Sequence, residues 1–183
     1  MSKENADKEQ KRSFKREAFS WIACIVVTIL LTEFILNFVI INANIPSGSM
    51  ENTIMTNDKL IALRTSYWFN DPKRGDIIIF KYPDDETEWF IKRVIALPGE
   101  TVLVKDGKVY INGSKKALSE PYIKEEPQED FGPYKVPKNG YFVMGDNRNN
   151  SNDAREWETH YVSRDEVLGK AWFRYYPSIK VIK

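Results

Sequence analysis

The sequence of 183 residues has only one cysteine and one histidine. Cys24 lies inside an apolar stretch, which excludes an internal disulfide, a cysteine-rich zinc site and a cysteine nucleophile in a soluble domain. His160 stands between Thr159 and Tyr161, a setting that does not suggest a Ser-His-Asp triad. We interpret it as a structural or surface histidine, so serine chemistry in this chain would need a different base.

An excess of charge of one sign is also missing. Lys and Arg total 27 and Asp and Glu total 26, and the basic residues are scattered along the chain. Nucleic-acid-binding domains instead gather Lys and Arg on one face. Nucleic acid is therefore not an expected partner.

One long hydrophobic run is present, at residues 18–41. As a helix, these 24 residues would extend about 36 Å, enough for a hydrocarbon core of about 30 Å. The run predicts a single transmembrane helix. A carboxylate at the bilayer centre costs roughly 2.5–3.5 kcal/mol, so we expect Glu33 near the far headgroups or protonated.

Residues 1–17 predict a basic tail in the cytoplasm, because Lys and Arg flanking an apolar helix stay inside. A cleaved signal peptide is the competing interpretation. It fits less well, because the run is longer than a signal-peptide core of 7–15 residues, and Ile41-Asn42-Ala43 offers one small residue for cleavage. In either case residues 42–183 are exported.

The exported part has the pattern of a mainly β domain with antiparallel strands. Runs rich in Val, Ile, Phe and Tyr alternate with turn residues, and Lys105-Asp106-Gly107-Lys108 is a strong hairpin signal. The predicted strands are 59–67, 76–82, 89–96, 101–105, 108–111, 141–144 and 168–176. Residues 114–139, with several prolines and charges, predict a long loop or a small flap.

A candidate nucleophile follows the apolar run in Ile45-Pro46-Ser47-Gly48-Ser49-Met50. An isolated Ser-Gly-Ser usually forms an ordinary turn. Here the bend lies a few residues beyond the predicted membrane exit, where it would present the Ser49 hydroxyl near the bilayer surface. Ser47 and the backbone N–H groups around Ser49 could then point at a developing oxyanion.

Lys92 is the candidate base, in the apolar run Phe90-Ile91-Lys92-Arg93-Val94-Ile95. On a strand both faces around it are largely apolar, and desolvation lowers the pKa of a lysine. A shift from about 10.4 to about 8 leaves roughly a tenth of the molecules neutral at pH 7. The alternative is that Lys92 extends to water or pairs with an acid. Together with Ser49, it favours a membrane-tethered serine hydrolase with a Ser/Lys dyad.

Residues 145–155 form a third segment, dense in Asn, Asp, Ser and Arg. Ser151 could orient an amine, and Asp153 and Arg155 could pair and brace the loop. A calcium loop is the alternative, but Asn152 replaces the turn glycine, and strands rather than helices flank the segment.

Taken in order, these segments resemble the bacterial type I signal peptidase family. The resemblance rests on Pro46-Ser47-Gly48-Ser49-Met50, Arg74-Gly75-Asp76-Ile77, Lys92-Arg93-Val94 with Leu97-Pro98-Gly99, and Gly145-Asp146-Asn147-Arg148 through Arg155. It implies that Ser49 is the nucleophile and Lys92 the general base, with Ser47 an oxyanion donor and Ser151 the group that orients the lysine. It also implies structural support of the site by Asp146, Arg148, Asp153, Arg155 and Arg93. Asn149 stands where the family usually has an aspartate.

The resemblance further implies peptide hydrolysis through an acyl-enzyme, with no metal or cofactor. The expected substrates are signal peptides of exported preproteins, bound as an added strand, with Met50 and Ile91 as walls of the substrate pocket. Membrane lipid is an expected contact, for which Trp68 and Phe69 would suit if exposed, and proximity to the secretion translocon is a further expectation.

Two alternatives remain from the sequence. A self-cleaving regulator of the repressor type shares Ser/Lys chemistry, but such proteins are cytosolic and carry a DNA-binding domain. A membrane-anchored β domain that assists exported proteins without catalysis would make the pairing of Ser49 and Lys92 a coincidence.

Overall fold

The computed structural model describes residues 3–182, with side chains from Phe14 onward. The chain divides into two compact units, residues 1–39 and 40–183. Residues 1 and 2 of the predicted tail and residue 183 of the predicted exported domain lie outside the described residues.

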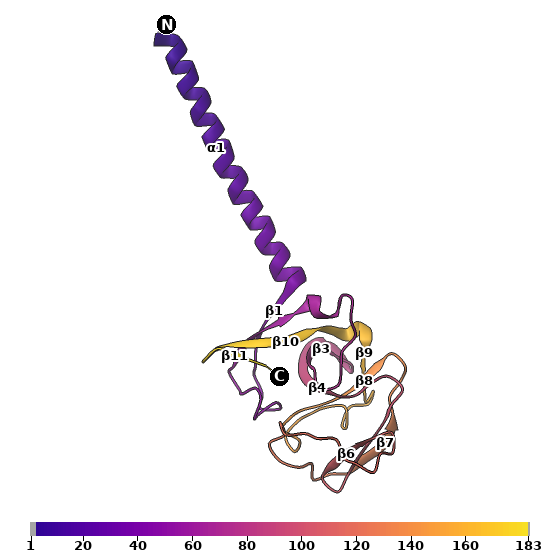
Figure 1. Ribbon diagram of the computed structural model, residues 1–183. Coiled ribbons are helices and arrows are strands. Elements are labelled where there is room, and N and C mark those ends of the chain that lie inside the picture. Colours follow the sequence, from indigo (N-terminus) through magenta and orange to yellow (C-terminus); the bar gives the residue numbers. More distant parts are fainter. Residues whose placement is uncertain (1–2, 183) are drawn as a thin grey trace. The chain divides into compact units, whose positions relative to one another are not determined.

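The first unit is helical (Figure 1). Helix α1 covers Lys3–Phe34 and continues into a π-helical segment, η1, at Ile35–Val39. Within it, Phe14–Val39 is long and apolar enough to cross a membrane. Strand β1 begins at Ile40, so the helix ends two residues before the predicted limit of 41. The Asn37 amide donates to the Glu33 carbonyl and carboxylate, so these two polar groups partly satisfy each other.

The second unit is built from antiparallel strands, as the sequence predicts. The described strands are β1 Ile40–Asn44, β2 Lys59–Leu63, β3 Ile77–Tyr82, β4 Asp85–Ala96, β5 Thr101–Lys105, β6 Lys108–Ile111, β7 Phe131–Lys135, β8 Gly140–Met144, β9 Val162–Ser163, β10 Val167–Tyr176 and β11 Lys180–Val181. The larger sheet has the order β1-β2-β10-β3-β4-β8-β9, with β11 paired to β10, and the smaller one has the order β6-β5-β7.

Strand β3 lies between two hydrophobic cores. Ile78 and Phe80 point into the larger core, to which all three strands of the smaller sheet contribute, while Ile77 and Ile79 point into a smaller core near β1 and β2. Because successive strand residues face opposite sides, a strand buried on both faces must be apolar at every position. This explains the uninterrupted run from Ile77 to Phe80.

Strand β4 is long and changes its partners along its length. Residues 85–93 pair with β3 on one edge of β4. On the other edge, β8 pairs only with the segment from Arg93 to Ala96. Within the described chain, residues 85–92 therefore present one edge without a neighbouring strand. Lys92 lies at the inner end of this open edge.

The predicted strands agree with the structure except near their ends. The predicted strand 59–67 stops at Leu63, and the polar residues after it form a 3-10 turn, η2 (Arg64–Tyr67), that brings the Tyr67 hydroxyl to 2.9 Å from Asp76 Oδ2. The Asp106-Gly107 hairpin is confirmed, with φ of 50° and 74° at these two residues.

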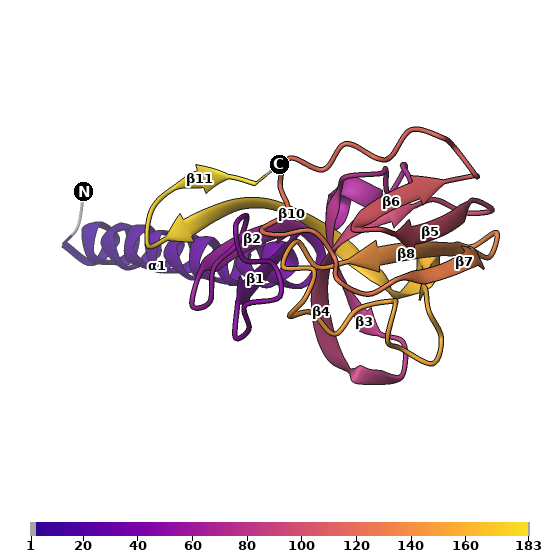
Figure 2. The same cartoon turned by 90° about the horizontal axis from the view of Figure 1, so that it is seen from below.

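The predicted excursion 114–139 is only partly a loop. Its end forms β7, which pairs with β5 at the edge of the smaller sheet. Gly132 and Pro133 conceal this strand in the sequence, because neither residue favours a strand interior and proline is tolerated at an edge. Residues 112–130 connect β6 to β7 without helix or strand (Figure 2).

Candidate active site

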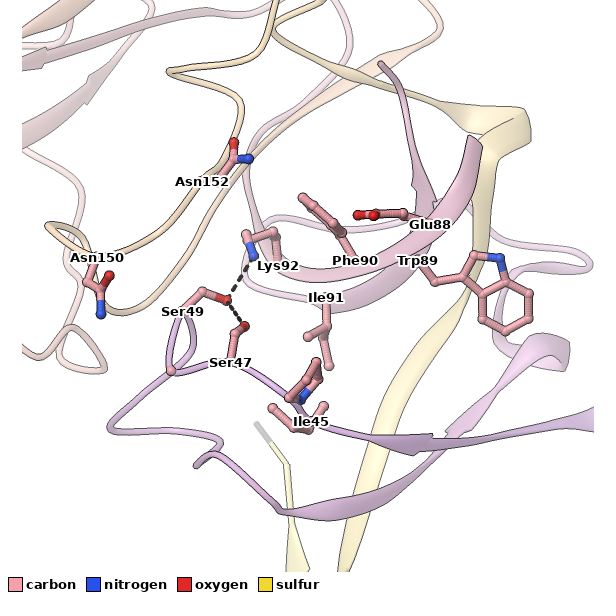
Figure 3. A pocket seen from close by; sticks show the side chains of 12 residues that line it. Ile45, Ser47, Ser49, Glu88, Trp89, Phe90, Ile91, Lys92, Asn150 and Asn152 are labelled. Atoms are coloured by element: carbon pink, nitrogen blue, oxygen red, sulfur yellow. Dashed lines mark hydrogen bonds between the residues drawn. The ribbon is translucent and has the colours of Figure 1, made fainter. Parts of the chain in front are cut away.

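The structure places Ser49 and Lys92 in direct contact. Lys92 Nζ lies 2.9 Å from Ser49 Oγ in a buried hydrogen bond, and Figure 3 shows the lysine reaching from β4 toward the serine. The exposed fractions of Ser49 and Lys92 are 7% and 4%. The two residues are 43 positions apart in the chain, so only the fold brings them together.

The turn that carries Ser49 is held by apolar side chains and backbone hydrogen bonds. Met50 and Ile54 are fully buried in the smaller core, and the amide of Ile54 donates to the carbonyl of Met50. The carbonyl of Ser49 accepts from the amide of Asn147, and the side-chain amide of Asn147 donates to Gly48. The hydroxyl is therefore fixed from both sides of its residue.

Burial lowers the pKa of Lys92 to about 8 from its usual value of 10.5, against an opposing attraction from the Asp153 carboxylate. The pKa shift follows from the fold, because the ammonium loses water without gaining a contact carboxylate. The Phe90 ring, 5.2 Å from Nζ, contributes to this apolar surrounding. At neutral pH about a tenth of such lysines are uncharged and able to accept a proton.

Ser47 lies beside the dyad. Its Oγ is 3.5 Å from Ser49 Oγ, at the limit of a hydrogen bond (Figure 3). Within the described residues the Ser49 amide donates no hydrogen bond to the protein. The Ser47 hydroxyl and the Ser49 amide are therefore both available to a carbonyl oxygen of a substrate.

Ser151 is near the dyad but does not bond to it in this conformation. Its hydroxyl is buried and has no hydrogen-bond partner in the described chain. The Ser151 hydroxyl has room only because residue 145 is a glycine: a Cβ there would collide with both Ser151 Oγ and the carbonyl oxygen of Ser49. The hydrogen bond to Lys92 that the resemblance implies is therefore not made here.

Buried ion pairs surround the dyad, and they include all five predicted supporting residues. Arg93 makes two hydrogen bonds to Asp146, of 2.8 and 2.7 Å, and Arg155 makes two to Asp153, of 2.8 and 2.9 Å. Arg148 is fully buried and pairs with a residue that the sequence did not indicate, Glu120.

Sequence reasoning missed three groups that complete these contacts: Thr53, Glu120 and Asn147. Thr53 donates to Asp146 over 2.5 Å, and Glu120 pairs with Arg148. Asn147 binds the turn at residues 48–54 that carries Ser49, which we call the nucleophile turn. Asn147 lies inside the Gly145-Asp146-Asn147-Arg148 motif, and Thr53 follows the Ser49 motif by three residues, so their positions in the sequence were a signal for both. Nothing near Glu120 in the sequence indicates which arginine it meets.

Replacing Asp146 with asparagine is expected to destabilise the protein by about 3–5 kcal/mol, because it removes the negative charge of a fully buried carboxylate that pairs with the buried Arg93 guanidinium. Chemical unfolding of the purified full chain, followed by tryptophan fluorescence, measures the change. The matched control is Glu86→Gln in the exposed pair with Lys81, which is expected to change stability by about 0.5 kcal/mol or less. Equal effects of the two substitutions would contradict this account of Asp146.

A cavity of about 540 Å³ opens in front of the dyad. The residues that line it are Ile45, Pro46, Ser47, Gly48, Ser49, Glu88, Trp89, Phe90, Ile91, Lys92, Asn150 and Asn152 (Figure 3). Ile91 is part of this wall. Met50 is not, because its side chain turns into the smaller core.

His160 lies away from the dyad. Its Nδ1 is 2.8 Å from the carbonyl of Ala154, and its ring contacts Phe131 and Tyr134. Among the described residues, no three His, Cys, Asp or Glu side chains are grouped to hold a metal ion.

A serine hydroxyl in contact with a desolvated amine, at the open edge of a strand and facing a cavity, is the arrangement that a serine hydrolase with a lysine base requires. The chain belongs to the signal peptidase family, peptidase S26, whose family model matches residues 18–176.

Proteins similar in sequence to this chain are named as signal peptidases. The chain is 44% identical over 161 residues to a probable signal peptidase I-2 of Synechocystis sp., covering 85% of this chain and 72% of the relative. It is 35% identical over 185 residues to signal peptidase I of Bacillus licheniformis, covering 96% and 97%. A crystal structure of signal peptidase I from Enterococcus faecalis aligns with a TM-score of 0.48 and 36% identity, covering 55% of this chain and 97% of the other.

Proposed function

We propose that this serine endopeptidase removes N-terminal signal peptides with Ser49 as nucleophile and Lys92 as general base. The observation that carries the proposal is the 2.9 Å hydrogen bond between a buried lysine amine and a buried serine hydroxyl. A positioned base within this distance can take the hydroxyl proton as the bond to carbon forms.

The reaction runs in two halves. Neutral Lys92 takes the proton of Ser49, whose oxygen attacks the carbonyl carbon of the last residue of the signal peptide. The Lys92 ammonium then protonates the departing amine, which is the new N-terminus of the mature protein, and leaves the signal peptide as an ester on Ser49. Neutral Lys92 then takes a proton from water, and the water oxygen attacks the ester carbonyl. As the bond to Ser49 breaks, the Lys92 ammonium returns the proton to the Ser49 oxygen, which releases the signal peptide and restores the enzyme.

Ser47 and Ser151 receive supporting roles in this proposal. The Ser47 hydroxyl and the Ser49 amide donate to the oxyanion of the tetrahedral intermediate, where preorganised donors have their largest effect. The buried hydroxyl of Ser151 can accept a hydrogen bond from Lys92 when the lysine is charged. An unpaired buried hydroxyl costs about 1–3 kcal/mol, so such a bond would be favourable.

The supporting role of the ion pairs is to hold residues 145–155 in a fixed shape against β4. Asp146 and Arg93 connect this segment, which we call the polar loop, to β4, and Asp153 and Arg155 brace the loop internally. Arg148 fixes the carbonyl of Gly145 through its Nε, 3.0 Å away.

The open edge of β4 supports binding of the substrate as an added strand. Residues 85–92 have unpaired backbone groups on the cavity side, and an extended peptide can form main-chain hydrogen bonds there. Ile91, on the cavity wall, then contacts a small side chain near the cut.

The membrane arrangement completes the proposal. The helical residues 18–39 anchor the protein, residues 1–17 remain in the cytoplasm, and the second unit, which begins with β1 at Ile40, acts on the outer side, close to the secretion translocon. Phe69 and Trp68, 90% and 53% exposed, support contact of the domain with lipid. Confining enzyme and precursor to one surface raises their effective concentration.

Cleavage by oriented vesicles tests the activity and the orientation together. Sealed right-side-out vesicles containing the full chain are expected to cleave a precursor added from outside without detergent. Inverted vesicles are expected to do so only after detergent opens them, because the active site is then in the lumen. Mass spectrometry of the products locates the cut.

Two results would count against the proposal. Absence of cleavage of several precursors in detergent would contradict the activity. Detergent-independent cleavage by inverted vesicles alone would contradict the orientation.

A further inference from the structure

The connection between β6 and β7 lies against the elements that carry the dyad. We define its residues 119–128 as the strap. The strap meets the nucleophile turn through the side-chain amide of Asn52, which donates to the carbonyl of Tyr122 over 2.9 Å. It meets β4 through the Tyr122 ring, 3.9 Å from the guanidinium of Arg93, the residue next to Lys92.

The strap also meets the polar loop, at three places. Glu120 pairs with Arg148, the amide of Lys124 donates to the carbonyl of Asp146, and Asn149 contacts the strap backbone. Asn149 Nδ2 donates to the carbonyl of Glu126, while its Oδ1 accepts from the amide of Gln128. An aspartate at position 149 could accept but not donate, so the asparagine of this chain matches the strap better.

Glu120 is the most buried of these contacts. Its carboxylate faces the Arg148 guanidinium in a bidentate pair, with distances of 2.6 and 3.0 Å, and the two side chains are 6% and 0% exposed. The Tyr122 hydroxyl donates to the same carboxylate over 2.9 Å. A planar guanidinium held this way has a fixed orientation.

Arg148 transmits that orientation to the nucleophile. Its Nε donates to the carbonyl of Gly145, and Gly145 lies against the carbonyl of Ser49 so closely that no side chain fits between them. The next contact along the loop is the amide of Asn147, which donates to the same Ser49 carbonyl over 3.1 Å. Two short steps therefore connect Glu120 to the backbone of the nucleophile.

We propose that Glu120 is a positioning residue for peptide cleavage: through Arg148 it holds the 145–147 backbone against Ser49 and so keeps the hydroxyl in line with Lys92 and the substrate carbonyl. This rests on the proposed function of the dyad. Glu120 does not line the cavity in front of the dyad and makes no hydrogen bond to Lys92, so its effect is on the geometry of the nucleophile and not on the charge of the base.

The test compares Glu120→Gln with the parent full-length enzyme, using a synthetic signal-peptide substrate in detergent. Glutamine keeps the size of the side chain but removes the charge and one of the two acceptors. We expect kcat to fall about 10- to 100-fold, because displacement of a reacting group by about 1 Å has effects of this order. KM is expected to stay within about twofold, and the acidic limb of the pH profile is expected not to move.

Two further variants separate positioning from stability. Glu125→Gln, an exposed carboxylate on the same strap, is the matched control and is expected to behave as the parent. Glu120→Leu with Arg148→Met replaces the pair by apolar side chains, which relieves the buried charge but also removes the bond to the Gly145 carbonyl. This double variant is expected to unfold at about the parental denaturant concentration and to keep a low kcat.

Several outcomes would overturn the inference. A folded Glu120→Gln protein whose kcat is within about threefold of the parent would do so, as would a loss confined to KM or a shifted acidic limb. If Glu120→Gln does not fold, the kcat of the double variant Glu120→Leu/Arg148→Met tests the inference instead. A parental kcat in the double variant would exclude positioning through Arg148. Loss of cleavage by Ser49→Ala with normal cleavage by Glu120→Gln would reject this inference alone and leave the dyad in place.

Discussion

Full-length protein with Ser49→Ala is expected to lose cleavage of signal peptides by a factor of at least about 10⁴ in kcat, since removal of a covalent nucleophile leaves only binding and oxyanion stabilisation. The substitution removes one oxygen from a residue that is 7% exposed and breaks its bond to Lys92. The turn itself is held by Met50, Ile54 and Asn147, none of which changes. Folding and binding of the signal peptide should therefore survive.

The assay is precursor processing in detergent, with binding measured separately by competition against the parent enzyme. Ser114→Ala, in an exposed loop away from the cavity, is the control and should retain full activity. Ser49→Ala protein that cleaves within about tenfold of the parent would eliminate Ser49 as the nucleophile.

Lys92→Met is expected to reduce kcat by about 10²–10⁴, the usual contribution of a general base. Because base and nucleophile act as one unit, the double variant Ser49→Ala/Lys92→Met should be no less active than the worse single variant. Lys81→Met, at an exposed lysine two strand positions from the β3–β4 turn, is the control. Multiplicative losses in the double variant would mean that the two residues act separately.

The same substitution is expected to stabilise the protein at pH 7. The pKa of Lys92 is about 8 in the folded chain and 10.5 when unperturbed, so burial of the ammonium costs about 3 kcal/mol below pH 8. The unfolded chain binds more protons between pH 8 and 10.5, so stability of the parent rises over this interval and the cost disappears above it. Methionine fills a similar volume without charge.

Chemical unfolding of both proteins measures this effect. The advantage of Lys92→Met is expected to be greatest below pH 8 and to shrink as the pH approaches 10.5. An advantage that does not depend on pH, or a variant less stable than the parent at pH 7, would show that Lys92 is not held against its own charge.

Local patterns were enough to predict much of the fold. The hairpin at Asp106-Gly107 is defined by four consecutive residues, and the strands β5 and β6 beside it have the predicted bounds. The runs that become β3 and β4 are apolar because the sheet is buried on both sides there. Lys92 could be identified because its charge contradicts that surrounding.

The remaining features depend on contacts between distant segments. Met50 follows the nucleophile directly, so the sequence places it near the pocket, but the turn at residues 48–54 rotates it into the smaller core. Strand β1 continues the apolar run of the anchor, and only its pairing with β2 distinguishes it. Glu120 is one of several acids in a charged loop, and its partner Arg148 is 28 residues away.

The pH dependence of acylation tests most directly whether an uncharged lysine activates Ser49. Single-turnover kcat/KM for a synthetic signal peptide reports the pKa of the base in the free enzyme. The account predicts that the rate rises with pH to a plateau, with a midpoint near 8, because Lys92 must lose its proton before it can accept that of the serine. A midpoint near 6.5, as for an ordinary histidine, or near 10.4, as for an exposed lysine, would contradict it.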